Sequence, residues 1–225
     1  MIVAPREAFE RLRTAPSWGW AFLITIVLGA IGALLSMPAA MHGFTASAAH
    51  QMAANAQYAQ MNAAQRQQVL AFTLLAVRFA WIFVPLFLLF SSFLQTIVML
   101  VFNAIGGGSG TFKTLWACAM NIAVPGFGLY QFAIGIINAA RGPTAYNSSL
   151  DYLLAMPSLG WLFPHGSPAT VAFFSTFNPF SIWSLFLTAA AMLTVARTSR
   201  INAYLPAVLI VLVAALFAMG GQARS

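Results

Sequence analysis

The amino-acid sequence predicts an all-α integral membrane protein with five transmembrane helices. Of its 225 residues, 61% are hydrophobic and only 6% are charged. A soluble domain would be close to a quarter charged, and it could not bury this much apolar surface in one core. A helix needs about 20 apolar residues to cross a hydrocarbon layer about 30 Å thick. Five segments are predicted to span, at residues 18–37, 79–105, 115–139, 179–196 and 201–219.

These spans divide the chain into three parts. Residues 1–17 form an N-terminal segment with five charged side chains, 18–219 form the transmembrane domain, and 220–225 form a short tail. The first apolar run is longer than the apolar core of a cleaved signal peptide, so we expect it to be retained as a helix.

Several residues set the expected boundaries. Pro38 is expected to end the first span, and residues 39–68 are too polar to cross, so they are interpreted as a loop, with partly helical structure near the interface as an open alternative. The apolar stretch that follows is too long for one span, and Arg78 is the natural point of division. A guanidinium at mid-membrane would cost at least about 2.5 kcal/mol. Gly220 and Gly221 are expected to end the fifth span.

The distribution of Lys and Arg predicts the orientation. With the N-terminus in the cytoplasm, the inner side carries six basic residues and the outer side four, in agreement with the positive-inside rule. An odd number of spans then places the C-terminus outside. The net charge of +7 comes from basic residues scattered singly between apolar runs, so the expected partner is the lipid bilayer and not nucleic acid.

A glycine-rich turn precedes the third span. It comprises Gly107, Gly108 and Gly110, followed by Thr111, Phe112 and Lys113. In a nucleotide-binding phosphate loop the lysine follows the last glycine directly and a β-strand precedes the loop, and neither condition holds here. We interpret the segment as a tight structural turn, with Gly108 and Gly110 adopting positive φ.

No residue pattern indicates catalysis, a metal site or a cofactor. The three histidines, His42, His50 and His165, are expected in solvated loops, without the spacing of a zinc peptidase helix. The only aspartate, Asp151, lies in a predicted loop, and the single cysteine, Cys118, cannot form an intramolecular disulfide. The chain is therefore not expected to be an enzyme.

Polar side chains in the third span leave two interpretations open. Asn121 and Gln131 flank Pro125, which is expected to kink this helix. Polar residues in lipid most often form hydrogen bonds between helices. The alternative is that Asn121 and Gln131 line a polar path for a small solute or ion.

Motifs along most of the chain resemble the YIP (Ypt/Rab-interacting protein) domain family, in particular its bacterial branch. They are the N-terminal Pro-Arg-Glu-Ala-Phe, the turn from Gly107 to Lys113, Pro125, and the helix entry Asn-Pro-Phe-Ser-Ile-Trp, which contains Pro179, Phe180 and Trp183. The resemblance implies five spans, a cytoplasmic N-terminus and a bacterial inner (cytoplasmic) membrane location. Eukaryotic relatives bind small GTPases, but this chain lacks their long N-terminal region.

The function expected from these observations is noncatalytic. The protein would act through contacts with lipids or with membrane protein partners, in a scaffold or membrane-organising role, and self-association into a homo-oligomer is left open. The alternative is a transporter or channel for a small solute or ion, acting as an oligomer.

Overall fold

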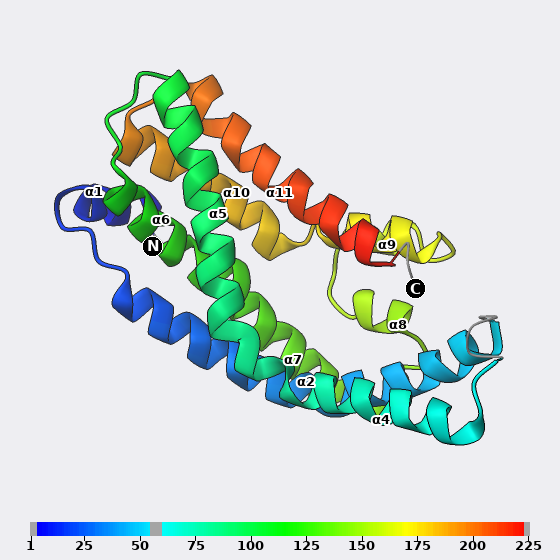
Figure 1. The fold of residues 1–225 in the computed structure, drawn as a ribbon. Coiled ribbons are helices and arrows are strands. Elements are labelled where there is room, and N and C mark those ends of the chain that lie inside the picture. The colour runs from blue at the N-terminus through cyan, green and yellow to red at the C-terminus, as the bar shows by residue number, and fades with distance from the viewer. Residues whose placement is uncertain (1–3, 55–59, 223–225) are drawn as a thin grey trace.

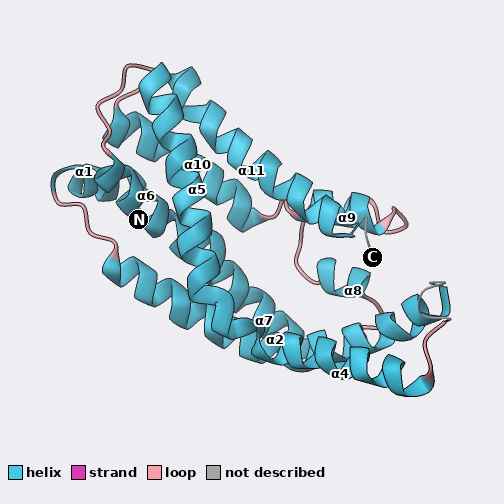
Figure 2. Ribbon diagram, in the orientation of Figure 1, coloured by secondary structure: helices cyan, strands magenta, loops and turns pink. Residues whose placement is uncertain are grey.

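The computed structural model describes residues 4–54 and 60–222, and every regular element within them is a helix (Figures 1 and 2). The α-helices are α1 (Pro5–Thr14), α2 (Gly19–Ala54), α4 (Ala63–Phe79), α5 (Val84–Ile105), α6 (Phe112–Ala123), α7 (Tyr130–Arg141), α8 (Ser149–Leu153), α9 (Pro168–Ser175), α10 (Pro179–Ala191) and α11 (Arg200–Gln222). Short 3₁₀ turns are η1 (Ala80–Phe83), η3 (Pro143–Ala145) and η4 (Leu159–Leu162), and π-helical turns are η2 (Val124–Leu129) and η5 (Met192–Ala196).

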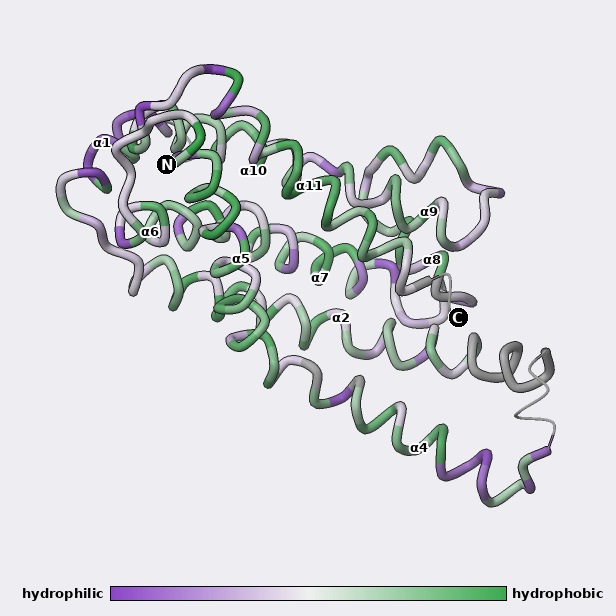
Figure 3. The backbone as a smooth tube through the Cα atoms, turned by 45° about the horizontal axis from the view of Figure 1, so that its top comes forward, coloured by the Kyte–Doolittle hydropathy of each residue, from purple (hydrophilic) through white to green (hydrophobic). Residues whose placement is uncertain are grey.

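Five helical stretches are long and apolar enough to cross a membrane, which confirms the predicted fold class. They are Gly19–Ala46, Trp81–Ile105, Phe112–Arg141, Pro179–Ala196 and Arg200–Gly221. The third stretch joins α6, η2 and α7 into one continuous helix, and the fourth joins α10 and η5. Hydropathy along the chain follows this division, with apolar helices and polar residues gathered in α1, the first turns of α4 and the connections (Figure 3).

The predicted end of the first span at Pro38 is wrong. Helix α2 continues through Pro38 to Ala54, and α4 begins at Ala63, so much of the expected loop at 39–68 is helical. Proline removes one backbone donor but does not stop a helix that neighbouring elements support. The residues that follow are rich in alanine, the strongest helix former, and their polarity was mistaken for a loop signal.

The division near Arg78 is confirmed, with a small shift. Arg78 lies exposed in the last turn of α4, and the turn η1 separates it from α5. The fifth membrane-spanning stretch ends at Gly221, close to the predicted end, and helix α11 itself continues to Gln222. Each glycine costs a helix only about 1 kcal/mol, which the end of a long apolar helix tolerates. Residues 223–225 of the predicted tail lie outside the described residues.

The connection between the third and fourth spans consists of short helices. Within residues 141–177, η3, α8, η4 and α9 follow one another, and α9 packs against α11. None of these helices is long enough to span a membrane. They lie at the end of the bundle opposite to α1 (Figure 1).

Helices α2 and α7 approach each other closely along their backbones. A Cβ atom on Gly32 would overlap the backbone carbonyl oxygen of Gln131, and one on Gly135 would lie 2.6 Å from the carbonyl oxygen of Gly32. Gly29 also faces Phe127, and a Cβ atom added to Gly29 would lie 3.3 Å from the Phe127 ring. Small residues let the backbones approach, which is the main source of helix association in lipid. Gly29 and Gly32 thus allow the first span to pack closely against the third.

Helix α1 closes one end of the bundle. Its apolar residues Phe9 and Leu12 are buried in a cluster with Met99, Leu115 and Val195. The charged residues of α1 stay on the outer side, so the helix is amphipathic and lies across the ends of α6, α10 and η5. This arrangement fixes the N-terminal segment to the transmembrane domain.

We predict that Gly32→Ala destabilises the protein by about 1–3 kcal/mol, because the added methyl group forces α2 and α7 apart. The matched control is Gly220→Ala, where a Cβ would meet nothing within 4 Å. Thermal unfolding of the detergent-solubilised protein should show a clearly lower midpoint for the first variant only. Equal midpoints would mean that the α2–α7 contact does not limit stability.

Candidate functional site

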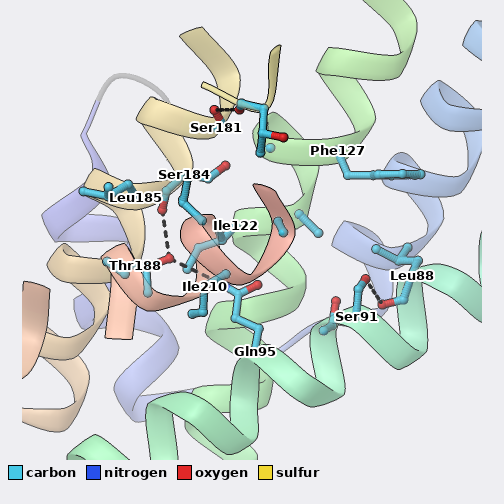
Figure 4. Close-up of a pocket in the computed structure, with 17 residues that line it drawn as sticks. Leu88, Ser91, Gln95, Ile122, Phe127, Ser181, Ser184, Leu185, Thr188 and Ile210 are labelled. Atoms are coloured by element: carbon cyan, nitrogen blue, oxygen red, sulfur yellow. Dashed lines mark hydrogen bonds between the residues drawn. The ribbon is translucent and has the colours of Figure 1, made fainter. Parts of the chain in front are cut away.

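A cleft lies among four of the five spans and is the main candidate for an intramembrane site (Figure 4). Its volume is about 180 Å³. The walls come from α5, from α6 and η2, from α10 and from α11. The polar residues that line the cleft are all uncharged: Ser91, Ser92, Gln95, Ser181, Ser184 and Thr188 on these walls, and Thr176 just after α9.

The helix entry at Asn178 places the α10 side of this cleft. The Asn178 side chain accepts hydrogen bonds from the backbone N–H groups of Phe180 and Ser181, and Pro179 stands in the first helical turn, where its missing N–H costs nothing. The helix then presents Ser181, Ser184 and Thr188 on one face, because residues three to four apart are neighbours on a helix. In Figure 4 these residues line the same wall.

Two further residues of this motif do not line the cleft. Phe180 meets Tyr130 of α7 edge to face, with ring centroids 6.0 Å apart. Trp183 is 36% exposed on the outside of the bundle. Phe180 therefore packs at the start of α10, where Pro179 is exposed in the first helical turn.

The opposite wall depends on the π-helical turn η2. Pro125 and Gly128 are buried in this turn, and the Gly126 position faces Ser184 so closely that a Cβ atom would overlap the hydroxyl oxygen. A proline cannot donate to the helix ladder, and a wider turn accommodates the lost bond. The expected interruption at Pro125 is therefore a π-helical turn that brings α6 and α7 against α10.

Hydrogen bonds within the protein occupy much of the polar surface of the cleft. Gln95 Nε2 donates to Thr188 Oγ1 over 3.2 Å, which links α5 to α10. Thr188 Oγ1 in turn donates to the backbone carbonyl of Ser184, and Ser184 Oγ donates to that of Phe180. The remaining space suits a few water molecules, each needing about 30 Å³, or a small neutral hydrogen-bonding group.

Asn121 and Gln131, the residues expected to line a polar path, do not meet at this cleft. Asn121 Nδ2 donates to the carbonyls of Ala117 and Ser17, at 2.8 and 3.0 Å. It therefore ties α6 to the link between α1 and α2. Gln131 lies in the α2–α7 contact and borders a separate cavity that also includes Arg78.

A buried polar network joins α2 to α7 at the end of the bundle opposite α1. Asn138 Nδ2 donates to Ser36 Oγ over 3.0 Å, and Tyr146 Oη donates to Asn138 Oδ1 over 2.6 Å. Burial raises the pKa of the Tyr146 hydroxyl, so it stays a donor. His42, expected in a loop, lies in α2 with its Nδ1 2.9 Å from the carbonyl oxygen of Tyr146. His50 is also helical, because the chain does not leave α2 at Pro38.

The glycine turn is organised by Asn103, which sequence reasoning did not assign to it. Asn103 Nδ2 donates to the carbonyl of Gly110, and the Gly110 N–H donates back to Asn103 Oδ1, each over 3.0 Å. The N–H of Ser109 donates to the carbonyl of Ala196 over 2.8 Å, so the turn also holds the end of α10 and η5.

The expected reason for Gly108 and Gly110 is wrong, because in this turn the positive φ of +62° belongs to Gly107. Gly108 and Gly110 are needed for close approach. A Cβ on Gly108 would overlap Asn103 Oδ1 and lie 2.7 Å from the carbonyl oxygen of Ala196, and one on Gly110 would lie 3.0 Å from the same Asn103 oxygen.

The last three residues of this motif begin helix α6. The Thr111 hydroxyl accepts from the N–H of Thr114, and the Thr114 hydroxyl accepts from the N–H of Thr111, which forms a reciprocal cap. Phe112 stacks on Trp116, with ring centroids 6.0 Å apart. Lys113 is exposed at this end of the bundle.

Comparison of the chain with protein-family models, with curated proteins and with solved structures gives no match. The resemblance to the YIP domain family remains a prediction from its motifs.

We predict that Gly108→Val lowers the thermal midpoint and the yield of folded protein, because its side chain would displace Asn103 and Ala196. Lys113→Gln should change either quantity much less, since the exposed ammonium takes no part in the turn. Both variants would be measured by thermal unfolding after purification in detergent. A tolerant Gly108 together with a Lys113 essential to some activity would instead favour an anion site at this turn.

Proposed function

We propose that the chain is a noncatalytic protein of the bacterial inner (cytoplasmic) membrane that acts through contacts with lipids and membrane protein partners. The observation that supports this most is the placement of charge. In the five apolar stretches the only charged residues are Lys113, Arg141 and Arg200, and each lies within two residues of an end. Ion coupling and proton relays use ionisable residues at membrane depth.

The clustering of basic residues at one end of the bundle supports a cytoplasmic N-terminus. Helix α1, the glycine turn and the connection before α11 lie at this end (Figure 1), and they carry six of the ten Lys and Arg residues: Arg6, Arg11, Arg13, Lys113, Arg197 and Arg200. The positive-inside rule assigns such an end to the cytoplasm. With five spans, the C-terminus would then lie outside.

A scaffold or membrane-organising role is consistent with the resemblance to the YIP domain family. Under this proposal the outer faces of the spans, which expose many large apolar side chains, contact lipid and partner helices, including other copies of the chain. The amphipathic α1 would present the aqueous surface for contacts on the cytoplasmic side.

The second candidate is a transporter or channel for a small neutral solute, and the cleft between α5, η2, α10 and α11 favours it. A proteoliposome flux assay separates the two proposals. We expect no solute or ion flux above that of protein-free vesicles, because the cleft is small and most of its hydroxyl groups are bonded within the protein. Flux that Gln95→Leu or Ser184→Ala alters would reject the scaffold proposal. Cross-linking in the membrane tests for partners.

We predict that a reporter fused after Lys113 is active in the cytoplasm and that a reporter fused to the C-terminus is active on the outer side. Paired alkaline phosphatase and fluorescent-protein fusions report the two locations directly. A cytoplasmic C-terminus would contradict the count of five spans.

A further inference from the structure

A groove lies between α1 and the end of the fourth span, beside the contacts that hold α1 to the bundle. Its volume is about 440 Å³. Arg6, Glu10 and Arg13 line it from α1, and Leu193, Thr194 and Arg197 line it from η5 and its C-terminus. The groove therefore has three guanidinium groups, one carboxylate and an apolar floor that continues into a membrane span.

The cations of this groove lack sufficient anions within the protein. Arg6 pairs with Glu10, with Nε and Oε1 3.4 Å apart. Arg13 and Arg197 have no ion-pair partner among residues 4–54 and 60–222. The chain has only three acidic residues, and Asp151 lies in α8 at the opposite end of the bundle (Figure 1). An anion entering the groove would therefore meet uncompensated positive charge.

Arg197 occupies a backbone conformation that usually requires glycine. Its φ and ψ are 56° and 35°, and it is the only residue other than glycine with positive φ in the described parts of the chain. Glycine is the common residue where a helix ends in this way. An arginine kept at a strained position suggests that its side chain has a use beyond ending the helix.

The depth of the groove indicates the kind of anion. Leu193 is 37% exposed and belongs to the fourth span, Arg197 directly follows the end of that span, and Arg6 and Arg13 line the same groove from α1. A phospholipid has this arrangement of phosphate above acyl chains. Guanidinium groups match the oxygens of a phosphate in geometry as well as charge.

We propose that the groove of Arg6, Arg13 and Arg197 binds the phosphate of an anionic phospholipid in the leaflet that faces α1. This inference rests on the proposed function, and it names the class of lipid and its site. Arg13 and Arg197 supply the free donors, Arg6 adds charge while bridged to Glu10, and Leu193 contacts the start of an acyl chain.

Binding of a fluorescent phosphatidylglycerol to the purified full-length protein in neutral-detergent micelles tests this proposal. Arg13→Gln should weaken binding roughly tenfold or more, the effect of losing one charged hydrogen bond. Arg11→Gln is the matched control, because it removes the same charge from the same turn of α1 without lining the groove. We expect the control to stay within about twofold of the unmodified protein, given the modest effect of an isolated exposed charge.

Arg197→Gly separates binding from folding. Glycine relieves the backbone strain, so the thermal midpoint should stay the same or rise while phosphatidylglycerol binding falls. Equal losses in Arg11→Gln and Arg13→Gln, or unchanged binding in Arg197→Gly, would overturn the proposal in favour of diffuse attraction by the basic surface.

Two further arms identify the source of the phosphate. Phosphatidylcholine should compete weakly, and inorganic phosphate at millimolar concentration should not displace the labelled lipid. Displacement by inorganic phosphate would make this a free-phosphate site and overturn the lipid assignment. Solute flux in proteoliposomes would refute the scaffold proposal even if the protein bound lipid. If the protein could be cross-linked to partners but did not bind phosphatidylglycerol, only the present inference would be refuted.

Discussion

The structure depends on one constraint: inside a membrane, every backbone N–H and C=O group must find its partner within the protein. Helices meet this requirement along their length, so the places where a helix is interrupted are informative. The interruption at Pro125 is not turned toward lipid. Pro125 and Gly128 are buried, and Gly126 faces Ser184 of α10. The kinked part of the third span therefore packs against other spans, and the packing that this requires creates the intramembrane cleft.

The same constraint is met by different interactions at the two ends of the bundle. At the α1 end, Phe9 fills the space between spans with apolar surface, while Asn103 pairs with the backbone of the glycine turn. At the other end, Asn138 pairs with Ser36 and Tyr146, so side chains link helix to helix. In both places the side-chain amide of an asparagine supplies a donor and an acceptor together. One residue can therefore form hydrogen bonds with two polar groups where water is scarce.

The number and type of spans could be predicted from sequence because the requirement for about 20 apolar residues is local. The continuation of α2 past Pro38 could not, since support for a proline inside a helix comes from neighbouring elements. The glycine turn was recognised, but Gly108 and Gly110 serve close approach to Asn103 and Ala196, which is a tertiary property. Ser184 and Thr188 had a usable signal in their helical spacing from Ser181. Asn121 and Gln131 were singled out by polarity alone, which does not reveal which partner a side chain finds.

The interior and the α1 end differ in what a ligand could gain there. In the cleft a ligand would compete with bonds that already exist, such as Gln95 to Thr188, and hydrogen bonds between membrane helices average only about 0.6 kcal/mol. Their modest strength is enough to determine which helix faces pair. Because these bonds already exist, few polar groups of the cleft are left to bind a ligand. At the α1 end, Arg13 and Arg197 have no ion-pair partner among the described residues, and in the proposed lipid site they bind the phosphate of a phospholipid. Basic side chains without an ion-pair partner, more than cavity volume, therefore distinguish the surface at which we propose that this protein binds a ligand. In the interior, by contrast, the polar groups serve packing.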